Sequence, residues 1–84
     1  MSVVEKKRER SLAEAVAVLV EKIHRSFPTA TTRPIPPYED EDFTLEVKIP
    51  KGVDREEAMN TCIRHALAVE DLFGFAILTR VREE

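Results

Sequence analysis

The chain has 84 residues, of which 43% are hydrophobic and 35% charged, and its formal net charge is −3. This length predicts one small α/β domain over residues 1–84 with a core near the lower limit of independent stability, so we expect self-association to supplement it. The single cysteine, Cys62, excludes an intrachain disulfide and a cysteine-based metal site, which favours a reducing, cytoplasmic location.

The first predicted element is a helix over residues 1–27. Ser11 and Glu14 match the Ser-x-x-Glu capping box, so either the helix begins near Ser11 behind a charged arm of residues 1–10, or residues 5–10 are already helical. We favour a helix that begins within the first ten residues and frays there. Basic residues before an apolar run resemble a secretion signal, but Glu14 interrupts the apolar part, so we expect a mature helix.

This helix is apolar around much of its circumference. Its main stripe, at spacings of three and four, is predicted to face the strands and consists of Leu12, Val16, Leu19, Ile23 and Phe27. Ala13, Ala17 and Val20 form a second row, and Val18 falls on the side expected to face water. Ala17, Val18 and Val20 are therefore candidate interface residues. The alternative is that an alanine-rich segment simply forms helix well and that an exposed Val needs no partner.

Residues 28–42 contain four prolines. Residues 29–35 are predicted to form either an edge strand, where proline is tolerated, or an extended polyproline-like connector, with residues 36–42 turning into the next strand. The acidic block Glu39–Asp42 lacks the ligand spacing and the glycine of a calcium loop, so we expect a solvated turn. The PxxP pattern at residues 34–37 is too weak to predict a partner.

Residues 43–49 alternate between apolar and polar types, which predicts a strand with one wet face. Gly52 permits the following turn, and Asp54 is expected to cap a helix, with Glu57 three residues later. Gly74 is predicted to end that helix in the left-handed conformation. The buried stripe of this helix is predicted to consist of Met59, Cys62, Ile63, Ala66, Val69 and Phe73.

Residues 75–81 are predicted to form the last strand. Because its apolar side chains fall on both faces until Arg80, we expect it to be more central than the strand over residues 43–49. The intervening helix is long enough to return along the sheet, so a right-handed parallel crossover is favoured. Leu78, on the second face of this strand, is a further candidate interface residue.

These elements predict a two-layer α+β sandwich of order α-(β)-β-α-β, with both helices on one face of a small sheet. We expect dimerisation through the sheet edge or the first helix to complete it. The element order resembles a ferredoxin-like domain that lacks its first strand, and equally a KH-like arrangement. The chain has only two glycines, Gly52 and Gly74, so the Gly-x-x-Gly clamp of KH modules is absent. The resemblance implies no residue roles.

Candidate chemistry is sparse. Cys62 and His65 are three residues apart on one helix, but a core thiol beside a boundary histidine is expected rather than a metal or redox site. Glu70 falls within the apolar arc, and we expect it to extend to solvent or to pair with Arg80 or an arginine of the first helix. Without a phosphate loop or a catalytic motif, we predict no enzyme activity, no cofactor and no metal.

The leading hypothesis for function is a non-catalytic interaction or regulatory module that forms an intracellular homodimer and binds another, unknown protein, with no membrane partner. The alternative is an RNA- or DNA-associated domain, because residues 1–33 contain seven Lys and Arg against four Asp and Glu. Residues 34–84 contain six against twelve, which disfavours a dedicated nucleic-acid binder. The candidate contacts for the alternative are Lys6, Lys7, Arg8, Arg10, Arg25 and Arg33.

Overall fold

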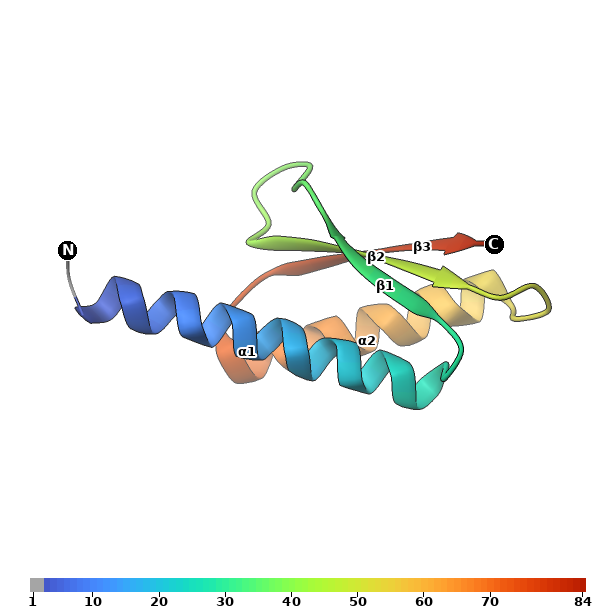
Figure 1. Cartoon of the computed structure of the whole chain (residues 1–84), viewed down its shortest axis with the longest axis horizontal. Coiled ribbons are helices and arrows are strands. Elements are labelled where there is room, and N and C mark those ends of the chain that lie inside the picture. Colours follow the sequence, from blue (N-terminus) through green and yellow to red (C-terminus); the bar gives the residue numbers. More distant parts are fainter. Residues whose placement is uncertain (1–2) are drawn as a thin grey trace.

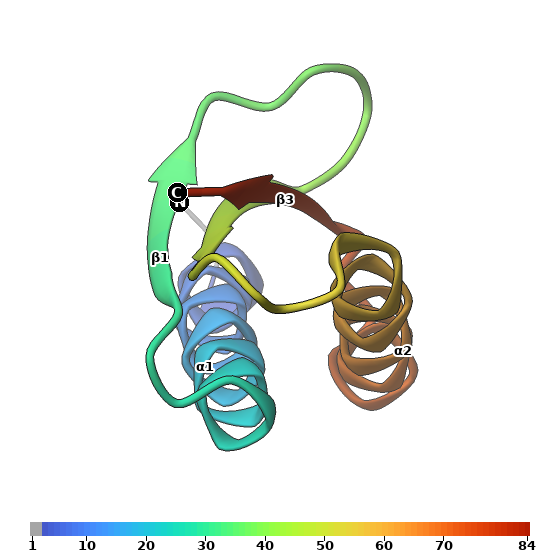
Figure 2. The same ribbon diagram turned by 90° about the vertical axis from the view of Figure 1, so that its right-hand side faces the viewer.

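The computed structural model describes the backbone of residues 3–84 and the side chains of residues 12–84. Its elements are α1 (Val3–Ser26), β1 (Thr31–Ile35), β2 (Phe43–Ile49), α2 (Arg55–Phe73) and β3 (Ile77–Glu83). Both helices lie on the same side of the sheet, and the loop before β2 arches over its other side (Figures 1 and 2). The predicted small α+β architecture is confirmed: two helices and a three-stranded mixed sheet. In the described part of the chain, no helix combines the length and apolar character needed to cross a membrane.

The strand order is β1-β2-β3, with β1 antiparallel and β3 parallel to β2. The strand predicted as one option for residues 29–35 is present as the edge strand β1, and Pro34 lies within it. The expectation that the last strand is more central than residues 43–49 is wrong, because β2 lies in the middle. The last strand, β3, begins at Ile77, and the buried Phe75 precedes it in the connection from α2. The apolar run at residues 75–78 therefore reflects a buried connection followed by an edge strand.

The core lies between the helix-facing side of the sheet and the two helices. From β2, the alternate residues Leu45, Val47 and Ile49 are almost completely buried. Leu19 and Ile23 of α1 are fully buried against them, and complete burial of such a side chain stabilises the fold by about 1.5–3 kcal/mol. The other predicted α1 stripe residues, Leu12, Val16 and Phe27, are partly buried against the same core.

Two predicted orientations on the helices are wrong. Val18, expected to face water, is half-buried and packs against the core. On α2, Met59 and Ile63 were expected in the buried stripe but are 41% and 47% exposed. The predicted burial of Cys62, Ala66 and Val69 is confirmed, and Ala58 completes a buried side made of small residues. Small side chains at spacings of three and four let the helix approach the sheet closely, which turns the larger ones outward.

The ends of α2 follow from local chemistry. Asp54 has extended backbone angles, and its Oδ1 accepts hydrogen bonds from the amides of Glu56 at 3.0 Å and Glu57 at 3.4 Å. Gly74 has a φ of 81°, in the left-handed region, and its N–H donates to the carbonyl of Glu70 at 2.7 Å. The predicted N-cap and C-terminal stop are confirmed. At the other helix, residues 5–10 are helical, so Ser11 lies inside α1.

The loop over residues 36–42 is organised by two carboxylates. Glu41 accepts hydrogen bonds from the backbone amides of Tyr38 at 2.7 Å and Glu39 at 2.9 Å and from the Thr44 hydroxyl. These bonds, with that of Thr44 the largest contribution, lower the pKa of Glu41 to about 2. Asp42 donates its N–H to the Ala76 carbonyl at 2.8 Å, and its Oδ2 accepts the Ala76 N–H at 2.9 Å. The loop therefore fixes the start of β3 beside the start of β2.

Replacing the cap residue tests this account of α2. We expect Asp54→Ala to lower the free energy of unfolding by about 0.5–2 kcal/mol, because two amides of the first turn lose their acceptor. Urea denaturation followed by circular dichroism measures the change. The same substitution at the exposed loop residue Asp40 is the control and should change stability by less than about 0.5 kcal/mol. Equal effects of both substitutions would contradict the capping role.

Candidate interaction surfaces

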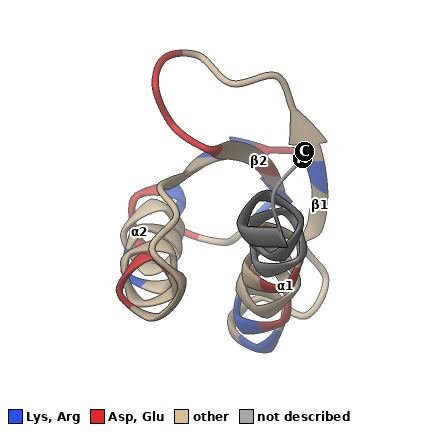
Figure 3. Ribbon diagram, turned by 90° about the vertical axis from the view of Figure 1, so that its left-hand side faces the viewer, with Lys and Arg blue, Asp and Glu red and all other residues tan. Residues whose placement is uncertain are grey.

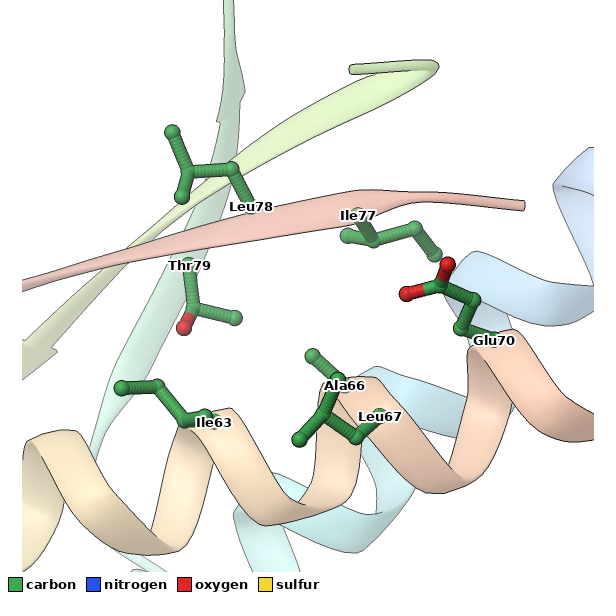
Figure 4. Close-up of a pocket in the computed structure, with 7 residues that line it drawn as sticks. All are labelled: Ile63, Ala66, Leu67, Glu70, Ile77, Leu78 and Thr79. Carbon is green, nitrogen blue, oxygen red and sulfur yellow. The ribbon is translucent and has the colours of Figure 1, made fainter.

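The first candidate surface is a groove between α2 and the outer edge of β3. It has a volume of about 190 Å³ and is lined by Ile63, Ala66, Leu67, Glu70, Ile77, Leu78 and Thr79. Figure 4 shows Thr79 on the side of β3 that faces α2, above Ile63 and Ala66, with Leu78 pointing away from the helix. Glu70 lies at one end of the groove, beside Ile77. The lining is largely apolar, as expected of a surface that binds protein.

An apolar row continues this groove along the outside of α2. Met59, Ile63 and Leu67 repeat every four residues and are 41%, 47% and 55% exposed. Such a repeat places the three side chains on one line along the helix. The row and the β3 edge together form the groove surface, defined here as Met59, Ile63, Leu67 and the outer edge of β3.

The second candidate surface is the face of the sheet that the helices leave open. Its side chains form cross-strand rows set by the register: Arg33, Glu46 and Arg80 in one row, and Thr31, Lys48 and Arg82 in the next. We call these two rows the basic sheet face. Figure 3 shows Lys and Arg on the strands, and Asp and Glu along the loop that arches over them.

Glu46 is the centre of the basic sheet face. Its side chain is only 8% exposed, and its two oxygens accept hydrogen bonds from Nε of Arg33 at 2.8 Å and Nη1 of Arg82 at 3.2 Å. These two guanidinium groups, Arg33 foremost, hold the pKa of Glu46 below its ordinary value of 4.5. The carboxylate therefore stays ionised near neutral pH and keeps both arginines in place over the sheet.

The other two cations of this face are not engaged by Glu46. Arg80 lies over the ring of Tyr38, with its guanidinium carbon 4.7 Å from the ring centroid. Lys48 is exposed. A depression of about 260 Å³ on this face is lined by Thr31, Thr32, Arg33, Glu46 and Lys48. The basic sheet face thus combines two cations bound to Glu46 with two that Glu46 does not bind, around a polar hollow.

The four predicted interface residues do not lie on one surface. Leu78 is 41% exposed and lines the groove. Ala17 is exposed on α1. Val18 and Val20 are half-buried and pack against the core, so much of their apolar surface is already used by the fold.

The predicted nucleic-acid contacts do not form one surface among the described side chains. Arg25 lies in the last turn of α1 and pairs with Glu21, whereas Arg33 lies opposite Glu46 on the face of the sheet away from the core. The side chains of Lys6, Lys7, Arg8 and Arg10 lie outside the described part of the chain.

The side chains of Cys62 and His65 do not form a joint site, because they lie in different surroundings. Cys62 is fully buried in the core, and burial raises the pKa of its thiol to about 11. His65 lies within 2.9 Å of the Ser26 hydroxyl and so links α2 to α1. Burial, followed by the positive charges of Lys22 and Arg64, lowers its pKa. A thiol this poorly ionised is a weak nucleophile.

The sequence analysis also singled out two acidic features, Glu70 and the block Glu39–Asp42, and the structure shows where both lie. Glu70 was expected to extend to solvent or to pair with Arg80 or an α1 arginine, and it is exposed at the groove, while Arg80 lies over Tyr38. The block Glu39–Asp42 forms the loop described above. Among the described residues, no group of three or more His, Cys, Asp and Glu side chains is arranged to hold a metal ion.

Sequence reasoning missed most of both surfaces. Lys48 meets Arg80 and Arg82 only through the pairing of β2 with β3, and no local pattern gives that register. Met59 and Ile63 were assigned to the core, although the smaller residues beside them at spacings of three and four indicate a closer packing face. Comparisons with protein-family models, curated proteins and solved structures gave no match to this chain.

The lowered pKa of Glu46 predicts a specific dependence of stability on pH. Because the pKa is lower in the folded chain, ionised Glu46 stabilises the fold above about pH 4.5, and this contribution is lost as the pH falls below that value. We expect Glu46→Gln to lower the urea midpoint at pH 7, and the gap from the wild type to close towards pH 2. The matched control is Glu39→Gln in the exposed loop. A gap that stays constant with pH would rule out the ion pairs as its cause.

The burial of Cys62 predicts slow alkylation. At pH 8, a shift of the thiol pKa from 9.0 to about 11 lowers the thiolate fraction by about 100-fold, and burial slows access further. We expect iodoacetamide to react with the folded chain at least ~100-fold more slowly than with the chain in 8 M urea. A cysteine placed at exposed Ala68 in a Cys62→Ser background is the control and should react quickly in both states. Rapid labelling of folded wild type would contradict the core assignment.

Proposed function

We propose that this chain is a non-catalytic protein-interaction module that acts as a homodimer joined through the groove surface. The observation that supports it best is the edge of β3, which pairs only with β2 within the described chain and lies beside an exposed apolar row on α2. An open strand edge is a template for pairing with another strand, and natural proteins usually cover it. The adjacent apolar row would add buried apolar surface to the interface, which backbone hydrogen bonds between two strands do not provide.

The orientation of α2 supports this proposal. The helix buries Ala58, Cys62 and Ala66 and exposes the larger Met59, Ile63 and Leu67. For an isolated domain the opposite arrangement would remove more apolar surface from water. A partner on the outer side of α2 accounts for the position of the large side chains.

A second copy is the occupant that fits this edge. Antiparallel pairing of two β3 strands about an axis at Thr79 would place Ile77 opposite Val81 of the partner subunit, both on the helix side. Arg80 would then lie opposite Leu78 of the partner subunit on the open face, which avoids direct contact between like charges. The same axis brings the two α2 rows together on one side, so one operation covers the whole groove surface.

The first helix is a weaker candidate for the interface. Val18 and Val20 already pack against the core, which leaves Ala17 as the exposed member of the predicted set. The side-chain geometry gives no support to catalysis by Cys62 and His65, because the thiol is enclosed in the core and the imidazole bonds to Ser26. The proposal therefore rests on the groove surface.

Solution mass tests the proposal. We expect light scattering to give about twice the chain mass of 9.6 kDa, and the same mass in 1 M NaCl because the interface is apolar. Ile63→Arg should raise the dimer dissociation constant by about tenfold or more, since it places a charge in the centre of the interface.

Ala17→Arg and Leu72→Arg are the matched controls, because both residues are exposed and lie outside the groove surface. Both variants should remain dimeric, and circular dichroism should show the wild-type helix content for all three. A monomeric wild type, or a dimer that Ala17→Arg dissociates and Ile63→Arg does not, would overturn the proposal.

A further inference from the structure

The basic sheet face has a charge opposite to that of the whole chain. In the two strand rows Arg33, Lys48, Arg80 and Arg82 surround one carboxylate, that of Glu46, which gives these rows a formal charge of +3, while the acidic block Glu39–Asp42 lies in the loop on the same side of the sheet (Figure 3). The chain as a whole has 13 Lys and Arg against 16 Asp and Glu, so the remaining residues sum to −6. The positive charge gathered on the strand rows attracts anions and orients them toward the strands.

Glu46 holds two of these cations in position without covering them. Arg33 uses Nε and Arg82 uses Nη1 to bond the carboxylate, while their side chains remain 67% and 58% exposed. A guanidinium has five N–H donors, so each group retains donors for a second acceptor. Phosphate oxygens suit such donors because they accept two parallel hydrogen bonds. The pair is therefore already ordered for an anionic ligand.

The spacing of the cations is that of a sheet. Neighbouring strands are about 4.8 Å apart, and alternate residues along one strand, such as Arg80 and Arg82, are about 6.6 Å apart. The four charges thus form a flat array rather than one pocket. Such an array fits a chain of anionic groups better than a single small anion.

An aromatic ring lies at the border of this array. Tyr38 is 57% exposed and contacts Arg80 from the loop that arches over the open side of the sheet. An exposed ring beside a row of cations is the combination with which proteins bind single strands, because bases stack on the ring while phosphates meet the cations.

From this arrangement we infer that the basic sheet face binds single-stranded nucleic acid, with phosphates on Arg33, Lys48, Arg80 and Arg82 and a base stacked on Tyr38. An acidic peptide would meet the same charges but has no base for the Tyr38 ring. A duplex presents its bases stacked inward and would meet the flat face only through phosphates. This inference goes beyond the proposed dimer and does not depend on it, because the face belongs to one subunit.

Binding of a labelled single strand tests the inference. With fluorescein-labelled dT12, we expect anisotropy to report saturable binding at 50 mM NaCl. Three or four phosphate contacts predict a roughly 20- to 50-fold loss of affinity between 50 and 200 mM NaCl. No binding at 50 mM NaCl would refute the inference.

Two sets of variants separate charge from stacking. Lys48→Ala with Arg80→Ala, which leaves the ion pairs of Glu46 intact, should weaken binding at 50 mM NaCl and flatten its dependence on salt. Tyr38→Ala should weaken binding by about fivefold or more without changing the salt dependence. The matched control removes two exposed cations elsewhere, Lys51→Ala with Arg64→Ala, and should leave binding within about twofold of wild type.

Other outcomes would contradict the inference. Equal binding of dT12, a 12-base-pair duplex and poly-glutamate, with no effect of Tyr38→Ala, would show a general anion-binding face. Loss of binding in Lys6→Ala with Lys7→Ala, but not in Lys48→Ala with Arg80→Ala, would place the contact on the N-terminal segment. Urea midpoints of all variants should match the wild type, so that lost binding is not lost folding.

Discussion

Strand β2 is the element on which the rest of the structure depends, because it pairs with both other strands and alternates between two different environments. Val47 faces the helices within the core, whereas Glu46 faces the open side beneath two arginines. A shift of one residue in register would exchange these positions, burying an unpaired carboxylate and exposing the apolar set. Packing on one face and ion pairing on the other therefore select the same register.

The two sides of β2 also explain why the two surfaces are chemically distinct. The helices cover one face of the sheet completely enough to enclose a core, so apolar residues that remain outside lie at its margin, on α2 and the β3 edge. The uncovered face keeps the polar half of each strand, and the register brings cations from all three strands around Glu46. Because the helices cover only one face of the sheet, the molecule has the apolar groove surface at one edge and the basic sheet face on the uncovered side.

Features set by neighbours in sequence were predictable, and features set by distant neighbours were not. The strand at residues 43–49, the Asp54 cap and the left-handed Gly74 each depend on a few adjacent residues, and the structure has all three. The predicted wet face of that strand is wrong at Thr44 and Glu46, which are 0% and 6% exposed, because the loop and the arginines on that side cover them. The position of β3 at the edge could not be read from its apolar residues, because Phe75 is buried before the strand begins. The cluster around Glu46 joins residues 13 and 36 positions away, which no periodicity reveals.

Pro34 in β1 limits how such a sheet can grow. Proline has no N–H to donate, and within a sheet it is tolerated at an edge with its nitrogen toward solvent, so the outer margin of β1 is a poor template for another strand. The sheet therefore has one edge that can be extended and one that is blocked. Association through β3 would stop at two subunits, with a blocked strand at each end, whereas a sheet with two open edges could polymerise into a fibre.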